Sequence, residues 1–243
     1  MTNPLHDITS SGVQSYLTPW FLCPYLANRK ARMQIATPSA LINVQVYSKL
    51  AQLGFRRSGK SISRPNCDAC QACVPVRVEV KRFIPNRVQK RVWKKHAALM
   101  ATVHPLHDAP EYFELFQRYM QARHPEHAHE LSTQYDHFLM GNSAESRLIT
   151  FHDKEVLRIV SIVDVHEDGL SAIHAFFEPH IPQSSFGTYH LLWLIEWCRQ
   201  SGLPYLHNSF WIEGNTTLAY KANFHATQGF VDNVWQLLLP ESI

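Results

Sequence analysis

The order of strand-like and helical segments in residues 146–237 constrains the fold of this chain more than any other feature. Three runs of alternating apolar and polar residues, joined by short turns, are typical of antiparallel strands. The apolar segment "TYHLLWLIEWCRQSG" predicts a helix that leads to a further strand, "LPYLHNSFWI", and then to a short helix and a last strand. Because a crossover helix can join parallel strands, this order predicts an α+β fold with a mixed sheet.

A glycine-bearing turn opens the long helix. We expect the helix to begin at about Thr188, which places the backbone N–H groups of Gly187, Thr188 and Tyr189 at its start. Such groups can bind a phosphate or an oxyanion. The order of elements, with this turn, resembles the acyltransferase fold of the N-acetyltransferase (GNAT) superfamily.

The two halves of the chain carry opposite charge. Residues 1–100 contain 16 Lys and Arg but only 3 Asp and Glu, a net charge of +13, whereas residues 101–243 contain 7 and 17, a net charge of −10. A solvated surface with balanced charges is one explanation. Because so few acidic residues interrupt the basic half, we favour a surface that attracts a polyanion.

Positive side chains crowd around Trp93 on a predicted helix, residues 85–101. Arg87, Arg91 and Lys94 share one face of such a helix, and a basic stripe of this kind can follow a phosphate backbone. For any single lysine, an ordinary exposed position is the more common explanation. The candidate polyanion-binding residues of the basic half are Arg29, Arg77, Arg87, Lys90, Arg91 and Lys94.

Three further elements are predicted in the basic half. Residues 37–54 are expected to form a helix with Thr37 as its N-cap. Residues 55–65 and 73–80 are expected to form two strands. The cysteines between these strands are therefore expected at a hairpin turn or knuckle.

The thiols in that turn follow one another at three-residue spacing. Cys67, Cys70 and Cys73 can point to one centre, and Cys23 can supply a fourth ligand. Zinc sites usually pair two separate Cys-x-x-Cys units, so this pattern is closer to an iron–sulfur arrangement. A knuckle of reduced thiols is the alternative. Cys198, within the apolar helix, is expected in the core.

The acidic half contains the candidates for reaction chemistry. Tyr220 and Lys221 lie on the predicted short helix, where a lysine of lowered pKa can act as a base and a tyrosine can relay a proton. Asp164 and Glu178 end strands, where a carboxylate can hold an ammonium group. For each of these residues alone, an exposed surface charge is the more common explanation.

The opening residues and the hydropathy indicate a soluble, cytoplasmic protein. The first residues lack a basic and apolar leader, and no apolar run approaches the ~20 residues that span a bilayer. Stable disulfides are rare in a reducing compartment, so the five cysteines are expected as thiols, metal ligands or a nucleophile.

Many ordered motifs connect the chain to one family. The stretches "WFLCPYL", "CDACQACVPVRVEV", "FIPNRVQKRVWKKH", "SSFGTYHLL" and "AYKANF" resemble the bacterial aspartate/glutamate leucyltransferases of the N-degron pathway, which are relatives of the eukaryotic arginyl-tRNA–protein transferases. The resemblance runs from about Tyr16 to Trp235. It implies that leucine moves from leucyl-tRNA to the N-terminus of a protein that begins with Asp or Glu.

The resemblance also implies that the two parts of the chain have different roles. Residues 1–105 would form a basic domain that holds the tRNA, with an iron–sulfur cluster or zinc on Cys23, Cys67, Cys70 and Cys73. Residues 106–243 would form a GNAT-like aminoacyltransferase domain without a nucleotide cofactor. The catalytic candidates are Tyr220, Lys221, Trp211 and Asp164. The candidates for the donor loop are Gly187, Thr188 and Tyr189, and those for binding the acceptor are Arg147, Glu178 and Lys221.

Three alternatives stay open. The stretch "HNSFWI" stands where relatives tend to have "YLGYWI", so the donor could be arginine instead of leucine. A small-molecule N-acetyltransferase would share the fold, but "QSSFGTYH" has one glycine where a pyrophosphate loop needs several. A non-catalytic tRNA-binding or redox-sensing protein would explain the basic half and the thiols. The sequence does not indicate an oligomeric state.

Overall fold

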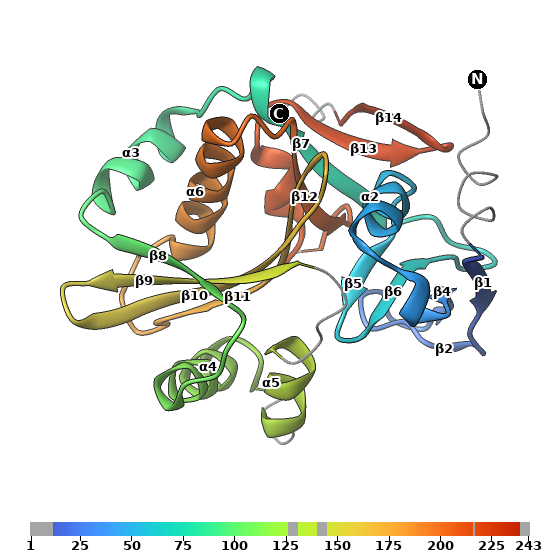
Figure 1. The fold of residues 1–243 in the computed structure, drawn as a ribbon, viewed down its shortest axis with the longest axis horizontal. Coiled ribbons are helices and arrows are strands. Elements are labelled where there is room, and N and C mark those ends of the chain that lie inside the picture. Colours follow the sequence, from blue (N-terminus) through green and yellow to red (C-terminus); the bar gives the residue numbers. More distant parts are fainter. Residues whose placement is uncertain (1–11, 126–130, 140–144, 216, 239–243) are drawn as a thin grey trace.

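The computed structural model describes residues 12–125, 131–139, 145–215 and 217–238, and the polar opening stretch lies outside this part. Its main feature is an eight-stranded sheet (Figure 1). In spatial order the strands are β14 (Val234–Leu237), β13 (Thr227–Val231), β7 (Val74–Glu79), β12 (Tyr205–Trp211), β11 (Gly169–Phe177), β10 (Val156–Val165), β9 (Ser146–Asp153) and β8 (Met100–Pro105).

One pair of neighbours in this sheet is parallel. β11 and β12 run in the same direction because α6 (Phe186–Gln200) crosses between them, whereas the other described pairs are antiparallel. The predicted α+β fold with a mixed sheet is thereby confirmed. In the described part of the chain, no helix is both long and apolar enough to cross a membrane.

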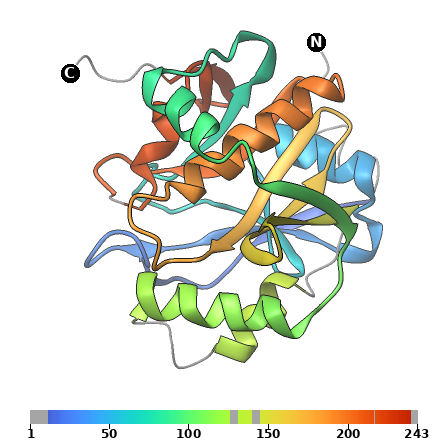
Figure 2. The same cartoon turned by 90° about the vertical axis from the view of Figure 1, so that its left-hand side faces the viewer.

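Helices cover both faces of the large sheet. α6 and α3 (Arg87–Lys95) lie on one face, and α4 (Pro110–Arg123) and α5 (Leu131–Leu139) lie on the other (Figures 1 and 2). Successive residues of each strand point to opposite faces of the sheet, so alternate residues pack into the two hydrophobic cores on those faces. Ile149 and Ile159 pack toward α6, while Leu148 and Val160 pack toward α4.

A smaller antiparallel sheet lies beside the large one. Its strands, in order, are β1 (Gln14–Leu17), β4 (Met33–Thr37), β6 (Ser61–Pro65) and β5 (Arg56–Ser58). α2 (Val44–Gln52) packs on it around a core that includes Tyr47 and Ile62. The short elements that complete the fold are β2 (Phe21–Leu22), β3 (Lys30–Ala31) and the 3-10 helices η1 (Ser39–Leu41), η2 (Val80–Arg82) and η4 (Ala219–Asn223).

Two local predictions in the basic half are wrong. Thr37 is not an N-cap, because it ends β4 and pairs with Gln14 of β1. The cap of α2 is Asn43, whose side-chain oxygen accepts a hydrogen bond from Val46 N at 3.0 Å. Residues 55–65 form two strands instead of one, β5 and β6, which turn back on each other at Gly59.

The strands that flank the cysteines belong to different sheets. β6 lies in the small sheet and β7 lies in the large sheet, between β13 and β12. The thiols therefore occupy a connection between sheets instead of a hairpin turn. Two strands of the large sheet, β7 and β8, come from residues 1–105, so residue 105 does not coincide with the boundary between the sheets.

Candidate active site and nucleic-acid surface

The site lies where the two parallel strands of the large sheet diverge. β11 and β12 pair over three residues each, and the last pair is Ser171 with His207. Both strands continue beyond this pair, to Phe177 and Trp211. The chain returns from β11 through α6, whose N-terminus follows the end of β11. In open sheets, ligands bind beside helix N-termini at the carboxyl ends of parallel strands.

The start of α6 differs in detail from the prediction. The helix begins at Phe186, and Ser185 before it has a left-handed φ of 54°. The Ser185 carbonyl accepts hydrogen bonds from the N–H groups of Thr188 at 3.0 Å and Tyr189 at 2.9 Å. These two predicted donors are thus used by the chain itself. The N–H of Gly187 lies in the first turn, where the helix offers no acceptor one turn back.

Lys221 is the buried cation of the site. Its side chain, on η4, is 7% exposed. Burial, and then the nearby charge of Arg56, lowers the Lys221 pKa to about 8. Within the described residues, no carboxylate forms an ion pair with the Lys221 ammonium group. Because an unpaired buried charge is costly, this lysine is a candidate for binding an anionic ligand.

Tyr220 lies beside Lys221 and borders a pocket of about 550 Å³ that Thr188 and Asn223 also line. Burial, and then the charge of Tyr119, raises the Tyr220 pKa to about 12. The hydroxyl is therefore protonated at neutral pH and can donate a hydrogen bond. Trp211, the other aromatic candidate, is half-buried at the end of β12.

Asp164 is held in an internal ion pair. The Arg57 guanidinium donates to both of its carboxylate oxygens, from Nε at 2.6 Å and from Nη2 at 2.9 Å. The Ser146 hydroxyl donates to the same carboxylate at 2.7 Å. Asp164 is 0% exposed. This geometry favours a structural role for Asp164 over the predicted catalytic one.

The two predicted acceptor-binding residues also have partners. Glu178 accepts from Arg118 Nε at 3.2 Å and from the His180 amide at 3.2 Å. Arg147 donates to the Ser146 carbonyl at 3.0 Å and lies 3.4 Å from Glu145. In the part of the chain that is described, no hydrogen bond joins either residue to Lys221.

His190 is a polar residue of this site that the sequence reading missed. Its Nδ1 lies 2.8 Å from the Gly187 carbonyl, so Nδ1 carries the proton and Nε2 is left as an acceptor. Burial lowers the His190 pKa to about 4, and the Lys221 charge acts in the same direction. A histidine in an apolar helix is easily taken for core, but its position one turn after Gly187 was the available signal.

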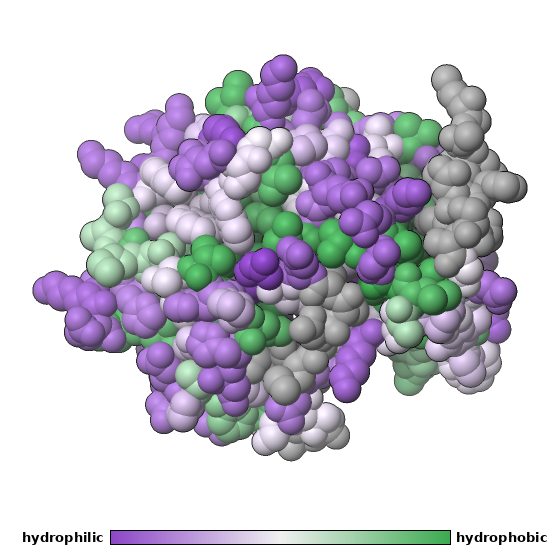
Figure 3. Space-filling model, in the orientation of Figure 1, coloured by the Kyte–Doolittle hydropathy of each residue, from purple (hydrophilic) through white to green (hydrophobic). Residues whose placement is uncertain are grey.

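Five exposed positive side chains and no acidic one mark α3. They include the predicted Arg87, Lys90, Arg91 and Lys94. In the space-filling view, hydrophilic residues project from the region of α3, at the upper left, among paler ones (Figure 3). This helix is the clearest surface for a phosphate backbone among the described elements.

Arg77 differs from the other predicted phosphate contacts. It is 7% exposed because it lies on β7, a central strand of the large sheet. Its guanidinium carbon lies 3.6 Å from the centre of the Tyr205 ring and 4.2 Å from that of the Trp235 ring. Nε donates to Gln228 at 2.8 Å. Arg77 therefore has the contacts of an interior cation instead of a surface one.

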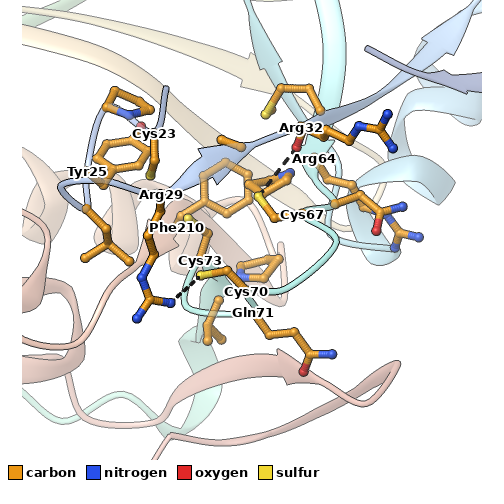
Figure 4. Close-up of a pocket in the computed structure, with 18 of the residues that line it drawn as sticks. Cys23, Tyr25, Arg29, Arg32, Arg64, Cys67, Cys70, Gln71, Cys73 and Phe210 are labelled. Atoms are coloured by element: carbon orange, nitrogen blue, oxygen red, sulfur yellow. Dashed lines mark hydrogen bonds between the residues drawn. The ribbon is translucent and has the colours of Figure 1, made fainter. Parts of the chain in front are cut away.

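The four predicted metal-ligand cysteines gather at one pocket of about 460 Å³ (Figure 4). Cys23 comes from the segment after β2, and Cys67, Cys70 and Cys73 come from the connection between β6 and β7. Arg29, a predicted tRNA contact, donates to Cys70 Sγ at 3.5 Å. Burial, and then the charges of the other three thiols, raises the Cys73 pKa to about 12.

Four cysteine thiols suit a thiolate-bound metal, but their side chains are not arranged around a common centre. Four cysteine sulfurs are the usual ligands of a tetrahedral zinc ion or an iron–sulfur cluster. Within the described residues, no three His, Cys, Asp or Glu side chains are arranged so as to hold a metal ion. The four thiols would therefore have to converge on the ion or cluster.

Comparisons with known proteins point to one family. Residues 21–91 match the model "Arginine-tRNA-protein transferase, N terminus" and residues 111–231 match the corresponding C-terminus model. The chain is 43% identical to an aspartate/glutamate leucyltransferase of Nitrosospira multiformis, covering 96% of this chain and 94% of that one. It is 42% identical to one of Methylobacillus flagellatus, over 92% and 91%.

Two solved structures resemble this chain at low sequence identity. L-PGS from Bacillus licheniformis matches 62% of this chain and 50% of its own length, at 11% identity and a TM-score of 0.45. FemX matches 86% and 83%, at 7% identity and a TM-score of 0.39. The family rests on the sequence matches, which cover almost the whole chain. The chain belongs to the arginine-tRNA–protein transferase family, among the aspartate/glutamate leucyltransferases.

Proposed function

We propose that this protein transfers leucine from leucyl-tRNA to the N-terminal Asp or Glu of proteins in the cytoplasm and so creates an N-degron. The names of the relatives support the donor and the acceptor. The positive surface of α3 supports a tRNA as the leucine carrier. The buried, unpaired Lys221 is the main observation in favour of an acceptor with an acidic first residue.

The reaction joins an amine to an activated ester. The deprotonated α-amine of the acceptor attacks the carbonyl carbon of the leucyl ester and forms a C–N bond. The C–O bond to the ribose then breaks, and the proton lost by the amine ends on the ribose oxygen of the departing tRNA. Because the ester is already activated, holding the two reactants together supplies most of the rate enhancement.

The site residues fall into three roles. The Gly187 amide at the start of α6 and the protonated Tyr220 hydroxyl stabilise the oxyanion. His190 Nε2 accepts a hydrogen bond from the attacking amine. The Lys221 ammonium binds the side-chain carboxylate of the acceptor's first residue. This carboxylate is the counter-charge that Lys221 lacks among the described residues.

We also propose that Cys23, Cys67, Cys70 and Cys73 hold a zinc ion or an iron–sulfur cluster. Bound there, the metal would tie the segment after β2 to the connection between β6 and β7. It lies outside the reaction steps above, which need only residues of α6 and η4.

A transfer assay tests the proposed function. Purified protein is given radiolabelled leucyl-tRNA or arginyl-tRNA, with peptides that differ only in their first residue, Asp, Glu, Asn, Gln or Lys. Leucine on the Asp and Glu peptides alone is the expected result. Arginine on those peptides would show that the donor is arginyl-tRNA. Acetylation by acetyl coenzyme A without aminoacyl transfer would show that the protein is an N-acetyltransferase. RNA binding without any transfer would support a binding protein instead.

A further inference from the structure

Trp93 is an exposed aromatic residue in the most basic helix of the described chain. It is 38% exposed. Within one turn of it on α3 lie Lys90 and Lys94, both exposed. An aromatic face between cations is the arrangement with which proteins bind unpaired nucleotides, because the bases stack on the ring while the cations contact the phosphates.

A pocket of about 570 Å³ adjoins this ring, between α3 and α6. Trp93 and Lys90 line one side, and Leu192, Arg199 and Gln200 line the other. The acidic side chain in the pocket, Glu196, pairs with Arg199. The pocket therefore offers two aromatic rings, those of Trp93 and Phe83, with apolar, amide and cationic groups, and its single carboxylate is already paired.

The ring lies close to the start of α6. Its centre is 5.7 Å from that of Tyr189, which is in the first turn of α6. The end of α3 is fixed to the loop before α6, because Lys95 Nζ donates to the Gln183 carbonyl at 2.9 Å and His96 is bonded to the Ser184 carbonyl. A leucyl ester bound at the first turn of α6 would place the nucleotides next to it beside Trp93.

We propose that Trp93 stacks on a base of the unpaired 3′ end of the aminoacyl-tRNA, while Lys90 contacts the adjacent phosphate. This subsite rests on the proposed function, since the ester is attached to the terminal nucleotide. It defines the path of the tRNA, which runs along α3 toward the N-terminus of α6.

A binding cycle tests the stacking without any need for transfer. The probe is a synthetic hairpin RNA with the acceptor stem of the tRNA and its unpaired 3′ end, either intact or with one 3′ base at a time removed to leave an abasic nucleotide. For the wild type, removal of the stacked base is expected to weaken binding roughly 5- to 150-fold. For Trp93→Ala, the intact probe should already bind that weakly, and removal of the base should have no further effect. Equal sensitivity of both proteins to every abasic position would overturn the proposal.

Kinetics separate this subsite from the function as a whole. Trp93→Ala should raise the KM for leucyl-tRNA and leave the KM for the Asp peptide unchanged, and Trp93→Phe should restore most of the affinity. Tyr16→Ala is the matched control, since Tyr16 is 51% exposed on β1, at the other end of the molecule from α3. If the wild type transfers no leucine, the proposed function fails, whatever the binding cycle gives. If it transfers leucine and Trp93→Ala keeps the wild-type KM for leucyl-tRNA, only the stacking fails.

Discussion

Arg57 and Asp164 join the two sheets through a buried ion pair in which the guanidinium donates to both carboxylate oxygens. Arg57 lies on β5 of the small sheet and Asp164 on β10 of the large one. Both side chains are 0% exposed. The pair is therefore a specific, solvent-inaccessible contact that sets how the small sheet packs on the large one.

Asp164→Asn should destabilise the protein strongly without a separate effect on catalysis. The substitution leaves the Arg57 charge buried without its counter-charge, a loss of about 3–5 kcal/mol. Urea unfolding midpoints, compared with the wild type, measure it. The turnover per folded molecule, at a temperature where the variant is still folded, should match the wild type. A normal midpoint with a lost turnover would return Asp164 to the catalytic group.

Lys221→Met should raise stability and abolish transfer to acidic acceptors. Burial holds the Lys221 pKa near 8 instead of 10.5, so the charged form at pH 7 costs the fold about 3 kcal/mol. An apolar side chain of similar length removes that cost together with the binding charge. Thermal unfolding and kcat/KM for Asp and Glu peptides give the two readouts. Unchanged selectivity for Asp and Glu over Asn and Gln would exclude Lys221 from acceptor recognition.

The pH dependence of transfer should be bell-shaped with its maximum near pH 8. The rising limb follows deprotonation of the acceptor α-amine, whose usual pKa is about 7.7–8.0. The falling limb follows loss of the Lys221 charge, because the ammonium is present below its pKa of about 8 and absent above it. The measurement is kcat/KM for an Asp peptide from pH 6 to 9.5, corrected for spontaneous hydrolysis of the ester. Lys221→Arg should move the falling limb to higher pH, and a falling limb unaffected by this change would belong to another group.

Replacing single thiols should release the metal that we propose Cys23, Cys67, Cys70 and Cys73 hold. Protein purified without oxygen is expected to contain zinc or iron, measured by elemental analysis, and Cys67→Ser, Cys70→Ser and Cys73→Ser should each lose most of it. Cys198→Ser is the control, since Cys198 is 0% exposed within α6 and outside the thiol pocket. Metal-free wild-type protein with full activity would show that the four thiols act without a metal.

Salt dependence should distinguish surface cations from interior ones. Lys94→Ala should weaken tRNA binding to all sequences and reduce the slope of log K against log salt concentration by about 1. Arg77→Ala should leave that slope unchanged and destabilise the fold, because it removes the cation between the rings of Tyr205 and Trp235. Anisotropy titrations at several salt concentrations, with urea unfolding in parallel, check both. A slope reduced by Arg77→Ala alone would place the tRNA at β7.

The sequence predicted the strands of the large sheet in residues 146–177 better than the elements of the small sheet. Alternation in residues 146–177 and the crossover helix were visible, because each strand and helix there carries its own periodicity. The hairpin at Gly59 was hidden, since β5 has only three residues. The cap at Asn43 was also missed, because Thr37 has the same capping chemistry and only its pairing in β4 excludes it.

The site was predicted in its residue types more than in its contacts. The four thiols line one pocket, although no three of them are arranged to hold a metal ion, and Lys221 lies buried close enough to His190 of α6 for its charge to lower the His190 pKa. Which charges are interior could not be predicted, because Arg57, Arg77 and Asp164 find their partners at sequence separations of more than 100 residues. His190 is the opposite case. Its place on an apolar helix indicates a core residue, and its role in the site can be inferred only because Lys221 lies nearby.

The position of β7 between β12 and β13 has a consequence for how the chain is made. Residues 74–79 leave the ribosome early, whereas both of their sheet neighbours lie in residues 205–231. The first half of the chain must therefore wait, with an apolar strand uncovered, until nearly the whole protein has been synthesised. A nascent chain that ends before residue 205 therefore contains the basic helix α3 but lacks β12 and η4, which the proposed site needs.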